Sequence, residues 1–327
     1  MLFRSVEVPA IDGGATEAGC DDPLTFAATR LPLQAAFERS HLHSRPMSQV
    51  QPYELLRRNA PLLISIPHLG RHVPADLRDS YSVESQLLED TDWHLDRLYQ
   101  FAAEIGATVL NATVSRYVID LNRAATGESL YPGMIATSLC PTETFRGAPL
   151  YKTGTAPNSA EISRRVDLYW RPYHAALNEE IARLRQLHAH ILLWDAHSIA
   201  SVLPRLFSGS LPDFNFGTAD GQSCDEAIVA GAVEALRDTQ WSWVVNGRFS
   251  GGFITRRYGD PGSGVHAIQL EMCQSLYMDE DAPFQWRSEL AAAVVPVVRA
   301  SIEGALRSVM EKSTPPHKAD IVLPSQL

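Results

Sequence analysis

The sequence has no long apolar run and little cysteine. None of its apolar stretches approaches the ~20 residues that a membrane-spanning helix needs. The start of the chain carries several acids and lacks the basic and then apolar pattern of a secretory signal peptide. The four cysteines stand apart without a CxxC pair, which argues against a disulfide framework and against a cysteine-bound zinc ion. We therefore expect a cytoplasmic protein with free thiols and no membrane partner.

An excess of positive charge and the common nucleotide-binding motifs are also missing. Lys and Arg number 28 against 38 Asp and Glu, so the formal net charge is −10, whereas a nucleic-acid-binding face is basic. The sequence contains no GxGxxG, no GxxxxGK[ST] and no GxSxG. These absences argue against a nucleic-acid partner, a nucleotide cofactor and a serine nucleophile.

The composition is that of a globular protein, with 45% hydrophobic and 20% charged residues in a chain of 327. Residues 1–46 contain turn formers and acids but no sustained periodicity. We expect 1–46 to be a poorly ordered extension, 47–312 to form a single domain that carries the functional site and 313–327 to be a tail.

Apolar strand-like runs alternate with amphipathic runs from residue 51 onward. Strands are expected at 61–68, twice within 107–123, and at 190–197, 242–247 and 264–272; helices are expected at 83–106, 159–188, 222–237 and 285–311. Alternation of helices with strands that are apolar throughout is typical of a parallel sheet covered on both faces. The sequence thus predicts a three-layer α/β/α fold with a mixed, mostly parallel sheet.

Polar residues end four of the expected strands. They are His68, the segment 120–123, His197 and Glu271, and Asp195 lies two residues before His197 on the same side of its strand. In open parallel sheets the ligand-binding crevice lies beyond the carboxyl ends of the strands. Any one of these endings could simply begin a loop, but four together predict a single site.

Two histidines and a carboxylate are the usual ligands of a catalytic zinc that keeps a fourth position open for water. His68 and His197 form the natural pair. Asp92 is the preferred third ligand, with Asp90 and His94 as alternatives, although an acid at this position could equally cap a helix. The expected cofactor is Zn²⁺ or another divalent metal, because imidazole and carboxylate also bind other ions.

Further residues suit amide hydrolysis at such a metal. Glu271 could act as the general base. Asn122 and Arg123 could bind a substrate carboxylate, since a guanidinium makes bidentate hydrogen bonds with it. Either Arg256 or Arg257 could bind a second one. Adjacent residues of an extended segment point in opposite directions, so only one is expected in the site, and Arg256 is preferred.

Several sequence blocks resemble the N-formylglutamate amidohydrolase family between about Pro52 and Glu280. The blocks, in order, are SIPHLGRHVP, DTDWHLDRLY, SRYVIDLNR, LYPGMIATSLCP, LLWDAHSI, PDFNFGTADGQSCD, NGRFSGGFITRRYGDP and GVHAIQLEMCQSLYM. The resemblance implies a zinc-peptidase-like fold and hydrolysis of N-formyl-L-glutamate to L-glutamate and formate, the deformylation step of histidine degradation.

The DLNR segment also resembles the segment with which metallocarboxypeptidases bind a substrate carboxylate. The chain departs from those enzymes because Arg71, three residues after His68, stands where their HxxE motif has glutamate. The same residues would serve a deacylase of another N-acyl amino acid or a carboxypeptidase-like hydrolase of short acidic peptides. A binding protein without turnover is a third interpretation. The sequence does not set the oligomeric state.

Overall fold

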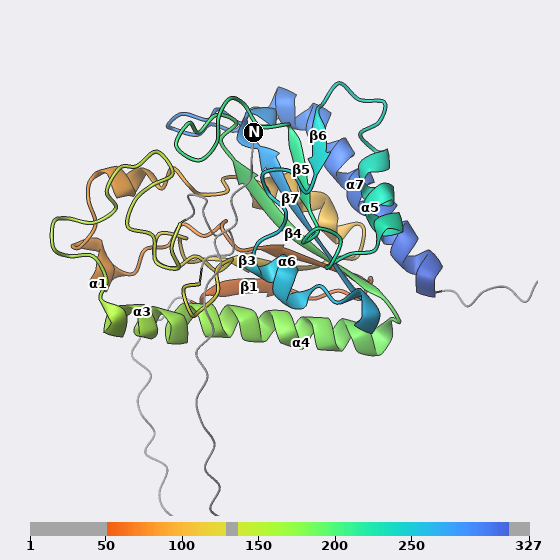
Figure 1. The fold of residues 1–327 in the computed structure, drawn as a ribbon, viewed down its shortest axis with the longest axis horizontal. Helices are drawn as coiled ribbons and strands as arrows, with labels where there is room; N and C mark the ends of the chain where they lie inside the picture. Colours follow the sequence, from red (N-terminus) through yellow and green to blue (C-terminus); the bar gives the residue numbers. More distant parts are fainter. Residues whose placement is uncertain (1–50, 129–136, 314–327) are drawn as a thin grey trace, which may run out of the picture. The chain divides into compact units, whose positions relative to one another are not determined.

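A mixed sheet of seven strands runs through the structure, a computed structural model that describes residues 51–128 and 137–313 (Figure 1). The strands lie in the order β1-β3-β2-β4-β7-β5-β6. Their bounds are β1 (Tyr53–Leu56), β2 (Leu62–Ile66), β3 (Thr108–Ala112), β4 (Ile191–Ile199), β5 (Phe214–Gly217), β6 (Trp243–Val245) and β7 (Val265–Cys273). Only the β1/β3 and β5/β7 pairs are antiparallel. The predicted mixed, mostly parallel sheet is confirmed.

Helices cover both faces of the sheet. One face carries α3 (Ser159–Arg165), a π-helical turn (Val166–Trp170), α4 (Arg171–Leu187) and α6 (Phe253–Tyr258); the other carries α2 (Leu95–Leu98), α5 (Glu226–Glu234) and α7 (Ser288–Ser313). Figure 1 shows α4 along one side of the sheet, with α5 and α7 together on the other side. The three-layer arrangement is confirmed. Short helices lie at α1 (Ala75–Arg78), Glu84–Leu87, Gln100–Ala103, Pro261–Ser263 and Gln274–Leu276.

The buried central strands explain why their sequences are apolar throughout. Every residue of β4 is buried, and its side chains alternate between two cores. Leu192 and Trp194 pack beneath α5 and α7, whereas Ile191 and Leu193 pack beneath α4. Because both faces of the strand are covered, neither set of alternating side chains can be polar except at the strand's end.

Two predicted elements are wrong. The helix expected at 83–106 is broken into three short helical turns, and Leu88 and His94 between them have positive φ angles of 49° and 63°. Of the two strands expected within 107–123, only β3 forms. The apolar residues that follow β3, including Tyr117 and Val118, are buried in turns rather than in a strand. These residues are apolar because they are buried, so their sequence looks like that of a strand although they do not pair as one.

The predicted helix over 159–188 exists as α3, the π-helical turn and α4. Pro172 lies where the π-helical turn passes into α4, and its missing N–H interrupts the helical hydrogen-bond ladder there. The segment carrying Arg256 and Arg257, expected to be extended, is the helix α6. The predicted domain boundaries at 46/47 and 312/313 remain predictions, because 1–50 and 314–327 lie outside the described residues.

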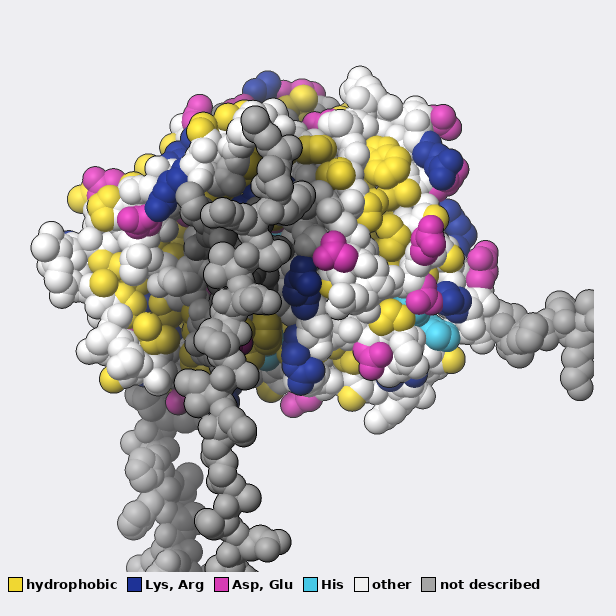
Figure 2. All heavy atoms as spheres, viewed as in Figure 1, with side chains coloured by type: hydrophobic (Ala, Val, Ile, Leu, Met, Phe, Trp, Pro, Cys, Tyr) yellow, Lys and Arg dark blue, Asp and Glu magenta, His cyan; other side chains and the backbone are white. Residues whose placement is uncertain are grey.

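The surface carries both charges. In Figure 2 acidic and basic side chains are interspersed over the face shown, with apolar side chains between them. None of the described helices is long and apolar enough to span a membrane. Cys140, Cys224 and Cys273 are buried free thiols.

Candidate active site

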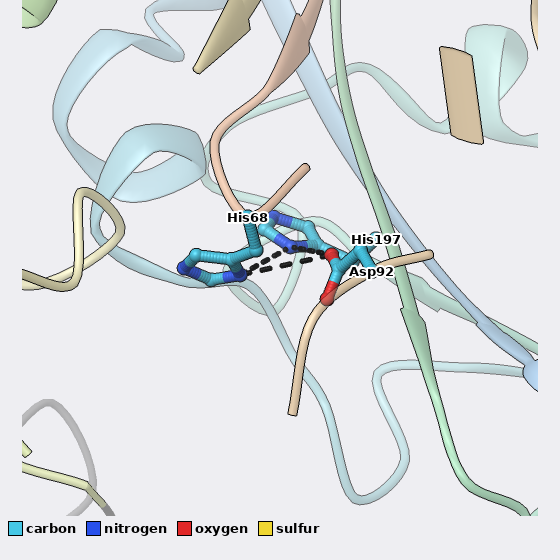
Figure 3. Close-up of side chains that lie close together, drawn as sticks. All are labelled: His68, Asp92 and His197. Atoms are coloured by element: carbon cyan, nitrogen blue, oxygen red, sulfur yellow. Dashed lines mark hydrogen bonds and ion pairs between the residues drawn. The ribbon is translucent and has the colours of Figure 1, made fainter. Parts of the chain in front are cut away.

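Three predicted residues from separate segments meet at the carboxyl ends of β2 and β4. His68 follows β2, His197 lies in β4 and Asp92 lies in the loop before α2. His68 Nδ1 is 3.1 Å from His197 Nδ1, and Asp92 Oδ2 is 3.7 Å from the first nitrogen and 3.3 Å from the second. Figure 3 shows the three side chains pointing toward one another. Among the described residues, this is the one group of His, Cys, Asp or Glu side chains close enough to hold a metal ion together.

The outer nitrogens of both rings are bound by carboxylates. His68 Nε2 lies 2.7 Å from Asp120 Oδ1, and His197 Nε2 lies 3.1 Å from Asp195 Oδ2. Carboxylates accept hydrogen bonds, so each Nε2 carries the proton and each Nδ1 presents a lone pair. Two lone pairs and the Asp92 carboxylate then face one another, an arrangement of three acceptors that a cation would stabilise. The donor set therefore fits a divalent metal ion.

The charged residues of this group strongly shift one another's pKa values. Burial alone would raise the pKa of Asp92, but hydrogen bonds and charge from His197 and His68 outweigh it and lower the pKa. Burial alone would lower the pKa of His197, but Asp195 and Asp92 raise it well above its usual value. Positive charge is thus strongly favoured between these acids.

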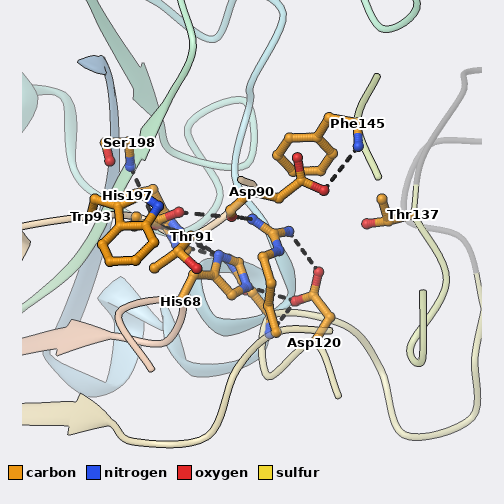
Figure 4. Close-up of polar contacts among 12 residues, drawn as sticks. His68, Asp90, Thr91, Trp93, Asp120, Thr137, Phe145, His197 and Ser198 are labelled. Carbon is orange, nitrogen blue, oxygen red and sulfur yellow. Dashed lines mark hydrogen bonds and ion pairs between the residues drawn. The ribbon is translucent and has the colours of Figure 1, made fainter. Parts of the chain in front are cut away.

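The two alternative ligands lie elsewhere. Asp90 Oδ2 accepts a hydrogen bond of 2.9 Å from the Phe145 amide, and Figure 4 shows its carboxylate turned toward Phe145. Burial raises the pKa of Asp90 to about 7. His94 Nε2 lies 2.7 Å from the carbonyl oxygen of Phe284. The structure therefore brings Asp92, and neither Asp90 nor His94, to the two histidines.

A buried arginine that the sequence did not single out lies beside the group. Arg116 donates a 2.9 Å hydrogen bond to Asp120 Oδ2, and its Nη1 is 3.8 Å from Asp92 Oδ1. Its guanidinium stands 4.6 Å from the centre of the Phe145 ring. Burial alone raises the pKa of Asp120, but His68, Arg123 and Arg116 lower it well below its usual value. Arg116 thus acts with His68 and Arg123 to keep Asp120 ionised.

Glu271 lies next to His197 across the sheet. The two residues are register partners in the parallel strands β4 and β7, so their side chains project from the same face. Both line one cavity together with His68. Burial raises the pKa of Glu271 to about 8, and a cation bound nearby would lower it.

Asn122 is held by contacts within the protein. Its Nδ2 lies 3.2 Å from Asp195 Oδ2 and 3.0 Å from His197 Nε2. Its Oδ1 accepts a 2.7 Å hydrogen bond from the Ile254 amide, in the first turn of α6. The side chain therefore joins Asp195, the partner of His197, to the start of a helix.

Of the three arginines considered from the sequence, the structure places Arg123 in the cavity lining and leaves Arg256 and Arg257 outside it. Arg123 lines the cavity, with its Nε donating to the carbonyl oxygen of Thr137 at 3.0 Å. Arg256 does not line the cavity; its guanidinium donates at 2.9 Å to the Gly251 carbonyl and to Ser250 Oγ. Arg257 is exposed.

Two further cavity residues, Arg248 and Gln269, were not singled out from the sequence. Both lie within blocks that resemble the family, which is the signal that could have found them. Gln269 Oε1 accepts a 2.6 Å hydrogen bond from the Gly252 amide. A Cβ atom on Gly252 would lie 2.4 Å from Asn122 Nδ2, so a side chain at 252 would push against Asn122.

Comparison with known proteins adds independent information. The family model described as N-formylglutamate amidohydrolase matches residues 60–278. An N-formylglutamate deformylase from Pseudomonas putida is 48% identical over 247 residues, which cover 75% of this chain and 92% of that protein. An N-formylglutamate deformylase from Pseudomonas aeruginosa is 48% identical over 251 residues, covering 76% and 94%.

Solved structures resemble the fold. The crystal structure of an N-formylglutamate amidohydrolase from Ralstonia eutropha JMP134 has a TM-score of 0.67 and 27% identity, covering 80% of this chain and 98% of that one. A protein from Agrobacterium tumefaciens has a TM-score of 0.62 at 15% identity, covering 80% and 97%, and bears on the fold alone.

Proposed function

Because this chain belongs to the N-formylglutamate amidohydrolase family, we propose that it hydrolyses N-formyl-L-glutamate to L-glutamate and formate. The two Pseudomonas relatives are named for this activity and align over nearly their whole length. The observation that carries the proposal is the group formed by His68, Asp92 and His197, with Glu271 beside it in one cavity.

His68, Asp92 and His197 would hold the metal, which we expect to be zinc or another divalent ion. When bound, such an ion supplies Lewis acidity toward a carbonyl group and toward water. Asp120 and Asp195 fix the orientation of the two rings through the Nε2 atoms. Asn122 Nδ2 donates to Asp195 Oδ2 at 3.2 Å and so helps to hold the carboxylate that orients the His197 ring.

Glu271 is placed to move the proton that hydrolysis requires. It accepts a proton from the attacking water, whose oxygen bonds to the formyl carbon, and delivers it to the glutamate nitrogen as the C–N bond breaks. Its position beside His197 and within the cavity supports this role.

Arg123 binds a substrate carboxylate in this proposal. It lines the cavity together with His68 and His197, and its Nη1 donates to the Asn122 carbonyl oxygen at 3.1 Å. Bidentate hydrogen bonds from a guanidinium suit a carboxylate. Arg256, the second arginine expected from the sequence, binds the loop before α6 instead. We place the reaction in histidine catabolism, as the family resemblance implies.

The test is formate release from N-formyl-L-glutamate by the purified protein, before chelation, after it, and after zinc is added back. We expect release that stops on chelation and returns with zinc. The N-acetyl and N-succinyl derivatives of glutamate serve as comparison substrates, because a pocket for formyl should reject both. Release from one of these and not from N-formylglutamate would replace the substrate and keep the hydrolase. Metal binding with no release from any of them would contradict the proposal.

A further inference from the structure

We propose that Arg248 binds the side-chain carboxylate of the substrate and so determines its selectivity for glutamate, an inference that rests on the proposed function. N-formyl-L-glutamate carries an α-carboxylate beside the scissile amide and a second carboxylate at the end of its side chain. A site that distinguishes it from other N-formyl amino acids must recognise the second group.

Besides Arg116, which is bound to Asp120, two arginines line the cavity. Arg123 and Arg248 line the same cavity as His197 and Glu271, and they come from different segments of the chain. Arg123 belongs to the turn after Asp120, the residue that binds His68, whereas Arg248 belongs to the loop between β6 and α6. A dicarboxylate could therefore be bound from two directions.

The order of the strands assigns each arginine to one carboxylate. The α-carboxylate is two bonds from the amide nitrogen and must lie near the candidate metal ligands. Arg123 fits this position because it lines the cavity with His68 and His197, and its Nη1 donates to the Asn122 carbonyl oxygen at 3.1 Å. Arg248 follows β6, which is separated from β4 by β7 and β5. It reaches the cavity from farther out, where the end of the substrate side chain would lie.

Neighbouring loops hold Arg248 at the cavity. Its Nε and Nη2 donate to the carbonyl oxygen of Leu206, another cavity residue, at 3.4 and 3.3 Å. Its guanidinium stands 5.2 Å from the centre of the Phe249 ring, and the side chain is half-buried. Arg256, by contrast, makes 2.9 Å hydrogen bonds to its own loop and lies outside the cavity lining.

The experiment crosses enzyme variants with two substrates. Arg248→Met removes the charge while keeping an unbranched apolar side chain. N-formyl-L-glutamine replaces the side-chain carboxylate by an amide of nearly the same shape. We expect Arg248→Met to lose roughly 10- to 100-fold in kcat/KM for N-formylglutamate, the range for a hydrogen bond to a charged group, and less than about threefold for N-formylglutamine. Arg248→Lys should recover part of the selectivity, since it restores the charge without the bidentate geometry.

Two matched variants complete the design. Arg123→Met should lose activity by a similar factor on both substrates, because both keep the α-carboxylate. Arg257→Met removes a positive charge from an exposed position of α6 and should leave the ratio of the two kcat/KM values unchanged. Calorimetric binding of L-glutamate and L-glutamine provides a readout without turnover, and Arg248→Met should weaken glutamate binding alone.

If folded Arg248→Met and Arg248→Lys keep the wild-type ratio of kcat/KM for N-formylglutamate to that for N-formylglutamine, the assignment is overturned. The proposed function is left intact by that result. A wild-type protein that releases no formate from either substrate would overturn the proposed function and this inference with it. The two failures are therefore distinct.

Discussion

At the scale of single residues, the proton transfer depends on one carboxylate outside the candidate metal ligands. Glu271→Gln keeps the shape of the side chain and removes its basicity. We expect kcat for formate release to fall by roughly 10²- to 10⁴-fold. Zinc content, measured by atomic absorption after dialysis, should match that of the wild type because no ligand is lost.

Glu234→Gln, the same change on the exposed surface of α5, is the control and should leave kcat unchanged. A Glu271→Gln variant within about tenfold of the wild type would refute the assigned proton transfer, because general acid–base catalysis contributes more than that. Loss of zinc together with activity would instead place Glu271 among the metal ligands.

The sequence located much of this site because its residues lie at the ends of buried strands. His68, His197 and Glu271 could be placed together by that argument alone. Other residues depend on contacts between distant parts of the chain. Asn122 was expected to bind the substrate, and it lines the cavity, but its amide also bonds with residues 73 and 132 positions away, which the sequence alone does not show. Arg116 resembles a surface charge in sequence, and only the fold surrounds it with acids.

At the scale of elements, the crossing of α5 and α7 depends on two glycines. A Cβ atom on Gly304 would lie 2.1 Å from the Gly231 carbonyl oxygen. Alanine favours a helix over glycine by about 1 kcal/mol, yet Gly304→Ala must separate the two helices. We expect a net destabilisation of about 1–3 kcal/mol, typical of overpacking, measured by urea unfolding.

Ala300→Leu adds more volume on the exposed side of α7 and is the control. It should change the free energy of unfolding by less than about 0.5 kcal/mol. A Gly304→Ala variant that is more stable than the wild type would show that the two helices separate without cost.

Elements were predictable where apolar runs coincide with strand pairing, as in β2, β4 and β7. The residues after β3 are equally apolar, yet they are buried in turns. The helix α6 begins where Asn122 Oδ1 accepts the Ile254 N–H, so its start depends on an acceptor from a distant turn. No local pattern contains that information.

At the scale of the whole molecule, a buried histidine makes stability depend on pH. His174 of α4 donates from Nε2 to the Leu121 carbonyl oxygen and accepts at Nδ1 from the Tyr258 hydroxyl. Burial lowers its pKa to about 4, against 6.5 in the unfolded chain. Between these values the unfolded state binds more protons, so stability is full above pH 6.5 and is lost as the pH falls toward 4.

His174→Gln keeps a donor and an acceptor but does not titrate. Between pH 7 and pH 5 its free energy of unfolding should fall by about 2 kcal/mol less than that of the wild type. Urea unfolding at the two pH values, with chelator present to remove the separate effect of metal binding, measures this difference. Equal losses in both proteins would show that His174 is protonated in the folded state.

The pairing of β4 with β7 fixes the reacting groups, whereas the arginines that would select the substrate stand on loops. His197 and Glu271 are fixed side by side by strand pairing, at the spacing of about 4.8 Å that the backbone ladder imposes. Arg123 and Arg248 stand on connecting segments, which accept substitution and changes of length more readily than strands do. Substitutions in these loops can therefore change which acyl amino acid is bound, while strand pairing keeps the reacting groups at the same distance.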